Sequence, residues 1–173
     1  LMAQDDITLV NLENVFSDDA AVQSSRYRFR GPVSYASILS AASIEVVNLA
    51  NNHTEDFGQE GYQSTLNALD SSGILISGST SNGNPVAIWE SEGIRIGFAG
   101  VIPLYYKDHP EEVSKCFEKL KEAGCQVIVA SLHAGKEYNP THGSMQDTYG
   151  KILRRLGANI IIGHHPHVPQ GIH

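Results

Sequence analysis

Short apolar segments rich in β-branched residues alternate along this chain with segments whose apolar residues recur at helical spacing. The predicted strands comprise residues 7–12, 44–49, 74–76, 126–132 and 159–162. The predicted helices comprise residues 31–42, 59–72, 111–123 and 144–156. Because strands that alternate with helices build a largely parallel sheet, the pattern predicts an α/β fold. Residues 86–89 and 94–101 add an antiparallel hairpin, whereas residues 17–30 and 103–110 are expected to be irregular.

Length and charge limit the classes of function. The 173 residues are enough for one domain with a real core, and we expect a single domain that is a fragment of a longer protein. A net charge of −7 argues against sequence-independent binding of nucleic acid, which needs a basic face. No apolar run approaches the ~20 residues of a membrane span. Cys116 and Cys125 are too few for a disulfide framework and are read as free thiols.

Three histidines follow the last predicted strand within four positions. In an extended segment, residues i and i+2 point the same way. His165 and His167 would then present two imidazoles to one place, with Pro166 stiffening the link between them.

Polar side chains follow three further predicted strands in the same manner. The four sets are Asn11 and Glu13, Asn52 and His53, His133, and His165 and His167. Because the carboxyl ends of parallel strands share one edge of a sheet, we expect all four sets at one rim. Imidazoles, a carboxylate and an amide oxygen without thiolate suit Zn, Mn or Fe(II). Taken singly, His133 could be a hydrogen-bonded structural histidine and Asn52 a turn residue; taken together, they predict a metal site.

Arg26, Arg28 and Arg30 occupy alternate positions. An extended backbone would place the three on one side. Such a row is usually a solvated face, and contact with an anionic substrate is the weaker alternative.

At these residues the chain resembles the CapA (poly-γ-glutamate synthesis, PgsA-like) capsule-synthesis family, a branch of the calcineurin-like metallophosphoesterase superfamily. The matching segments are Asn11-Leu12-Glu13, Ala50-Asn51-Asn52-His53 with Asp56 and Gly58, residues 132–138, Gln146, and residues 163–168 with Gln170. They span nearly the whole chain in the family's order. The resemblance implies a four-layer α/β/β/α sandwich with mixed sheets and two bound divalent ions of Mn, Fe or Zn.

The resemblance also implies roles for individual residues. The implied metal ligands are Glu13, Asn52, His133, His165 and His167. His53 would be the catalytic residue beside the leaving group, and His164 stays outside the ligand set. Asn11, Asp56 and Glu137 are secondary candidates. Against the family pattern, a first strand ending in Gly-Asp and the segment beyond Gln170 are absent, and Ala134 replaces a tryptophan.

Two classes of function follow from the resemblance. The leading hypothesis is a metal-dependent phosphoester hydrolase of capsule or poly-γ-glutamate biosynthesis. The alternative is a non-hydrolytic factor for assembly or export that binds the acidic polymer, and a purely structural partner is a third class. In each case we expect membrane-bound capsule synthesis or export proteins as partners and an extracytoplasmic place in the cell envelope. An anchor is not visible in this chain.

Overall fold

The computed structural model describes residues 2–19, 27–78 and 80–172. Its first sheet contains β1 (Leu9–Asn11), β4 (Val46–Asn48) and β5 (Leu75–Ser77). The three strands are parallel, in the order β1-β4-β5. All three therefore end at the same edge of the sheet, as their apolar character and the helical connections between them predict.

The second sheet contains β6 (Ala87–Ser91), β7 (Ile94–Val101), β8 (Val127–His133) and β9 (Ile160–His164), in that order. β6 and β7 form the predicted antiparallel hairpin. β7, β8 and β9 are parallel to one another, and His133 lies opposite His164 in the register of the last pair.

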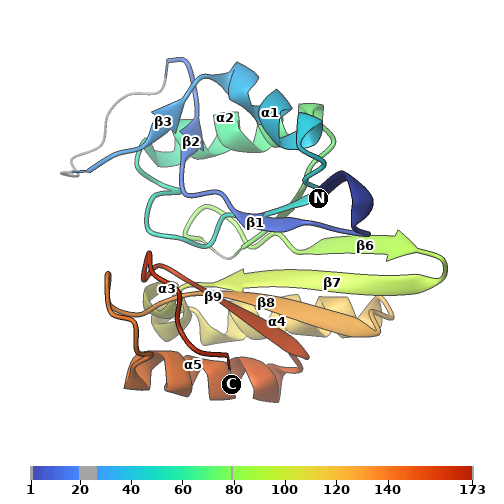
Figure 1. Ribbon diagram of the computed structural model, residues 1–173, viewed down its shortest axis with the longest axis vertical. Coiled ribbons are helices and arrows are strands. Elements are labelled where there is room, and N and C mark those ends of the chain that lie inside the picture. The colour runs from blue at the N-terminus through green and yellow to red at the C-terminus, as the bar shows by residue number, and fades with distance from the viewer. Residues whose placement is uncertain (1, 20–26, 79, 173) are drawn as a thin grey trace.

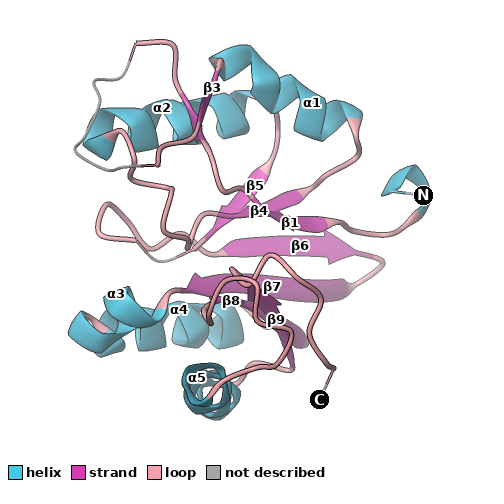
Figure 2. Cartoon of the chain, turned by 60° about the vertical axis from the view of Figure 1, so that its left-hand side comes forward, coloured by secondary structure: helices cyan, strands magenta, loops and turns pink. Residues whose placement is uncertain are grey.

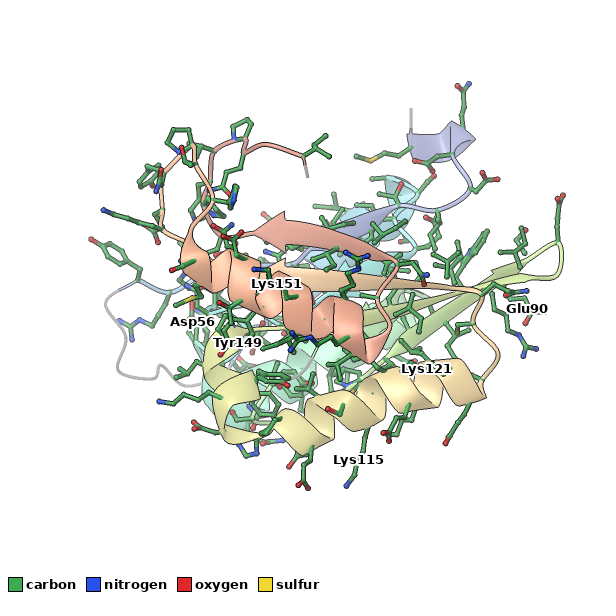
Figure 3. All side chains as sticks on the ribbon, turned by 90° about the horizontal axis from the view of Figure 1, so that it is seen from below. Asp56, Glu90, Lys115, Lys121, Tyr149 and Lys151 are labelled. Atoms are coloured by element: carbon green, nitrogen blue, oxygen red, sulfur yellow. The ribbon has the colours of Figure 1, made fainter. Side chains whose placement is uncertain are left out.

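Helices cover the outer faces of the two sheets (Figure 1). On the first sheet lie α1 (Ala36–Ala41), preceded by the 3-10 turn η2 (Val33–Tyr35), and α2 (Gly58–Ser71). On the second lie α4 (Pro110–Glu122) and α5 (Ser144–Leu156), and Lys115 of α4 is directed away from the sheet (Figure 3). The layers therefore follow the order helix, sheet, sheet, helix (Figure 2), which confirms the predicted four-layer α/β/β/α sandwich.

A separate apolar cluster fills each interface between layers. Val46, Ala87, Phe98 and Val129 pack between the two sheets. Val47, Leu49, Tyr62 and Leu69 belong to the cluster under α1 and α2, and Val113, Phe117, Leu120 and Leu153 to the cluster under α4 and α5. These side chains are almost all inaccessible to solvent, so each sheet is held on both faces.

The two sheets lie in close contact near the carboxyl ends of β4 and β7. A Cβ atom on Gly100 would collide with the side chain of Asn48, which is fully buried. Asn48 Nδ2 donates to Asn11 Oδ1 at 2.9 Å, and its Oδ1 accepts from the backbone N–H of Ala50 at 3.2 Å. Gly100 therefore leaves room for an amide that connects the first sheet to the loop after β4.

Two segments depart from the prediction. Residues 103–110 are not irregular: α3 (Pro103–Asp108) forms there, with proline at its start. Within residues 17–30 and their flanks, β2 (Val15–Phe16) pairs in parallel with β3 (Arg30–Gly31) beside α2. The remaining regular element is the 3-10 turn η1 (Met2–Gln4).

The predicted helix over residues 31–42 is also shorter, because regular helix begins only after η2. Within the described part of the chain, no helix is both long and apolar enough to cross a membrane. The assignment of residues 1–173 to a single domain stays a prediction.

Candidate metal centre

The polar side chains that follow β1, β4, β8 and β9 meet where the two sheets end. Figure 3 shows Asp56, from the loop after β4, on the side of the molecule toward which β9 points. β1 and β4 belong to the first sheet, whereas β8 and β9 belong to the second. The expectation of a single sheet rim was therefore wrong in this respect: the site lies between the carboxyl ends of two facing sheets.

Glu13 lies at the centre of the group. One ligand atom each from Glu13, His165 and His167 lies within 4.8 Å of the other two. Glu13 Oε1 is also 3.7 Å from His133 Nε2 and 4.0 Å from His53 Nε2. The carboxylate thus faces imidazoles delivered by both sheets.

Asn11 holds Glu13 in place. Asn11 Nδ2 donates to Glu13 Oε2 at 3.2 Å, and Asn11 Oδ1 accepts from Asn48 Nδ2 at 2.9 Å. A chain of amides therefore runs from the buried Asn48 to one oxygen of the carboxylate, which leaves the other oxygen toward the histidines. Both polar atoms of the Asn11 side chain are hydrogen-bonded in this way. Asn11 therefore positions Glu13 from the side opposite the histidines.

His133 is buried, with its Nε2 atom 2.6 Å from Asn52 Oδ1. Burial, together with the neighbouring His165, lowers the pKa of His133 from 6.5 to about 3. The imidazole is therefore neutral near pH 7, as a metal ligand must be. Its Nδ1 atom is buried and has no hydrogen-bond partner among the described residues.

The loop after β9 departs from the extended backbone that the sequence suggested. His165 has a φ of 95° and His167 a φ of 56°, both in the region that non-glycine residues rarely occupy. The alternation argument for these two histidines was therefore wrong, although their ring centroids are 6.1 Å apart. Strained backbone at two neighbouring polar residues is typical of a functional site.

His53 is oriented by a carboxylate. His53 Nδ1 lies 2.9 Å from Asp56 Oδ2, and the same oxygen accepts the backbone N–H of Phe29 at 2.9 Å. Asp56 is buried, whereas His53 is half-buried at the edge of the group. The carboxylate accepts a hydrogen bond from Nδ1–H, and Nε2 is the nitrogen that faces Glu13.

Asn51 is a site residue that the sequence did not single out. Its side chain donates to the Leu12 carbonyl at 2.9 Å and accepts from the His53 N–H at 3.0 Å. It therefore ties the loop after β4 to the segment that carries Glu13. Its position between Ala50 and Asn52, directly after a buried strand, is the feature that could have identified it.

A cleft of about 940 Å³ opens onto this group. The cleft is lined by Glu13, Tyr27, Phe29, Asn52, His53, Asp56, Glu137, Tyr138 and His167. Glu137 is exposed there and offers a carboxylate at the entrance.

Arg28, Arg30 and His164 are not among the side chains whose ligand atoms converge with Glu13. Arg28 and Arg30 are absent from the lining, and the guanidinium of Arg30 lies 5.2 Å from the centre of the Phe57 ring. Arg26 falls outside the described residues. Burial lowers the pKa of His164, and its buried Nε2 atom has no partner among the described residues. His164 is not part of the group formed by Glu13, His165 and His167.

These residues fit a divalent metal ion. Three features of the group are unfavourable without a ligand. The Nδ1 atoms of His133 and His165 are buried and have no partner in the described part of the chain. The backbone of His165 and His167 is strained, and the Glu13 carboxylate converges on their rings. The set that could hold metal is Glu13, Asn52, His133, His165 and His167. Its nitrogen and oxygen donors match Mn, Fe(II) or Zn.

Comparisons with known proteins agree with this architecture. A family model described as "Bacterial capsule synthesis protein PGA_cap" matches residues 1–173. The capsule biosynthesis protein CapA of Bacillus anthracis is 31% identical over 148 residues, which are 75% of this chain and 36% of that protein. The PGA biosynthesis protein CapA of Bacillus subtilis (strain 168) is 28% identical over 156 residues, 78% of this chain and 40% of that protein.

The chain therefore spans two fifths or less of the length of these curated relatives. Among solved structures, a hypothetical protein from Thermus thermophilus matches with a TM-score of 0.59 at 17% identity. The match covers 98% of this chain and 60% of that one, and it shows a shared fold.

Proposed function

Because this chain belongs to the bacterial capsule synthesis protein family, we propose that it serves in making a capsule polymer and does so by metal-dependent hydrolysis of a phosphoester. The Bacillus subtilis relative is named for PGA biosynthesis, which makes poly-γ-glutamate synthesis the first pathway to consider. We further propose that the protein works at the cell envelope with membrane-bound capsule synthesis or export proteins.

One observation carries the proposal: Glu13 approaches His165 and His167 so closely that their ligand atoms lie within 4.8 Å of one another. Together with Asn52 and His133, these residues would hold two divalent ions of Mn, Fe or Zn. Bound ions of this kind neutralise charge on phosphoryl oxygens and make water a stronger nucleophile near neutral pH.

His53 is the proton donor in this proposal. Asp56 accepts the hydrogen bond of Nδ1–H, so the ring in its imidazolium form directs a second proton, on Nε2, toward the cleft that contains Glu13. A proton delivered there stabilises the oxygen of the departing group, which is typical work for a positioned histidine. The buried Asp56 also keeps the imidazole from rotating.

The test is a screen of phosphodiesters with metal-loaded protein and His53→Gln. We expect turnover by the wild type and a drop in kcat of about 100-fold for His53→Gln, with bound metal retained. The matched control is His142→Gln, which alters a histidine that pairs with Asp147 at 3.2 Å outside the described cleft lining. Equal kcat for His53→Gln and His142→Gln would contradict the role of His53.

The non-hydrolytic alternative, binding of the acidic polymer, rests on the family and on the name of the Bacillus subtilis relative. The described lining of the cleft contains Glu13, Asp56 and Glu137 but no lysine or arginine. Such a surface repels a polyanion unless bound metal compensates. Binding of poly-γ-glutamate by the same sample, without turnover of any phosphodiester, would favour the alternative.

A further inference from the structure

Of the three exposed aromatic side chains in the described lining of the cleft, Phe29 and Tyr138 lie beside its imidazoles. Phe29 is 47% exposed and Tyr138 is 72% exposed, and both line the cleft that contains Glu13. The centroid of the Phe29 ring is 4.4 Å from that of His53, and the centroid of the Tyr138 ring is 6.1 Å from that of His167. One aromatic ring therefore stands beside the proposed proton donor and the other beside a proposed metal ligand.

The backbone of each aromatic residue is tied to the site. The N–H of Phe29 donates to Asp56 Oδ2, the oxygen that also orients His53. The N–H of Tyr138 donates to the Pro166 carbonyl at 2.7 Å, and Tyr138 has a φ of 59°. Left-handed backbone at a non-glycine residue costs free energy, yet the ring gains little packing because it remains exposed. Fixed, exposed rings at a cleft are binding surfaces more often than parts of the core.

We propose that Phe29 and Tyr138 are stacking surfaces for ring groups on the two sides of a phosphodiester substrate. The inference rests on the proposed function, because the position of the phosphoryl group is set by the metal ligands and His53. The leaving oxygen lies at His53, so Phe29 stacks on the leaving group and Tyr138 stacks on the group that keeps the phosphate. The shared chemistry is a flat base or the C–H face of a sugar, both of which stack on aromatic rings.

The charge of the cleft favours the same class of substrate. In the described part of its lining there are three carboxylates, those of Glu13, Asp56 and Glu137. A diester carries one negative charge, placed at the metal ligands, and its ring groups can be neutral. A chain with a carboxylate on every residue and no ring would meet these carboxylates and leave both aromatic surfaces uncovered.

Three diesters with the same leaving group test the inference: the p-nitrophenyl diesters of methyl phosphate, thymidine 5′-phosphate and glucose 6-phosphate. The preference of the wild type is the ratio of KM for the methyl diester to KM for a ring-bearing diester. We expect Tyr138→Leu to reduce this preference about tenfold, since one stacked ring is lost. If Tyr138→Leu reduces the preference for the thymidine diester alone, the stacked group is a base. If it reduces the preference for the glucose diester, the stacked group is a sugar.

Phe29→Leu tests the other side. All three substrates place p-nitrophenyl on the leaving oxygen, so we expect KM for each to rise about tenfold and the preference to remain. The control is Tyr35→Leu, which alters a tyrosine that is 51% exposed and lies outside the described lining. Unchanged preference in Tyr138→Leu together with unchanged KM in Phe29→Leu would overturn the inference.

A binding measurement separates this inference from the proposed function. Saturation-transfer NMR of thymidine 5′-phosphate with zinc-loaded protein reports contact with the rings without requiring turnover of a diester. If the wild type hydrolyses none of the diesters but its transfer to the thymine ring is lost in Tyr138→Leu, the hydrolytic function fails and the stacking surface stands. If turnover is normal and transfer is the same in wild type and Tyr138→Leu, the stacking surface fails alone.

Discussion

His53 and Asp56 form a directed pair in which Nδ1 of the imidazole lies 2.9 Å from Oδ2 of the buried carboxylate. We predict that Asp56→Asn lowers kcat on phosphodiesters about 10- to 100-fold while bound metal is retained, because the orienting charge is lost but no metal ligand is. Steady-state kinetics with metal analysis of the same sample checks this. A matched control is Asp147→Asn, which disrupts the pair with His142, and indistinguishable kcat values for the two variants would contradict the prediction.

The burial of His133 predicts how stability depends on pH. The pKa of His133 is about 3 in the folded protein and 6.5 when exposed. Between these two pH values the unfolded chain therefore binds a proton that the folded protein does not. The contribution of His133 to the free energy of unfolding, measured in chelator, is therefore fully present above pH 6.5 and is lost as the pH decreases toward 3. The slope from this one group is at most ~1.4 kcal/mol per pH unit.

Urea unfolding of chelator-treated protein across this range measures the slope. His133→Gln is expected to flatten it relative to wild type, and Gln63→Ala, which removes only a surface contact with Asn67 and no titratable group, is the control. If the free energy of unfolding depends on pH in the same way in wild type and His133→Gln, His133 is protonated equally in the folded and unfolded states, which would contradict the prediction.

The close approach of the two sheets gives a prediction about the fold. Gly100→Ala places a methyl group against the buried Asn48 and is expected to lower the free energy of unfolding by about 1–3 kcal/mol, as overpacking does. Gly150→Ala is the matched control, because a Cβ atom there meets nothing within 4 Å and alanine favours the helix by ~1 kcal/mol. Denaturant unfolding of both variants is the measurement, and equal stability of the two would be the contrary result.

A second network connects the loop after His133 to the loop that carries His167. Gln146 Nε2 donates to Gln170 Oε1 at 2.8 Å, and Gln170 Nε2 donates to the Asn139 carbonyl at 2.8 Å. We predict that Gln146→Ala weakens metal affinity about tenfold, because groups behind the ligands fix their orientation. Titration calorimetry with Mn or Zn checks this against Gln63→Ala, which removes only a surface contact with Asn67. Equal affinities for the two variants would assign Gln146 a purely structural role.

Much of the fold was readable from the sequence where the pattern was long. The helix Ser144–Leu156 has the predicted bounds because Gly143 precedes it and Gly157, with a φ of 113°, ends it. α3 was missed because six residues are too few to show helical spacing. It is stabilised by its neighbours instead: Tyr106 packs edge-on against Tyr149 at 5.6 Å. Strands of two residues, such as β2 and β3, show no alternation at all.

Which side chains converge was easier to predict than the geometry of their convergence. Polar residues after buried strands indicated Glu13, His133 and His165, because strand ends collect ligands. The strand pattern alone could not reveal which strands belong to which of the two sheets, since the apolar pattern of a strand does not identify the strands beside it. It also could not reveal the left-handed backbone at His165, which follows from the contacts of the loop and not from residue type.

The most direct test of the account is metal content and phosphodiester turnover measured on the same sample of wild type and His165→Ala. Plasma mass spectrometry should find Mn, Fe or Zn in stoichiometric amount in the wild type. His165→Ala, which removes one of the three converging ligands, should lose metal and turnover together. His142→Ala, an imidazole outside the described cleft lining, should retain both. The central claim would be contradicted if His165→Ala turned over substrate at the rate of the wild type, or if the wild type turned over substrate without bound metal.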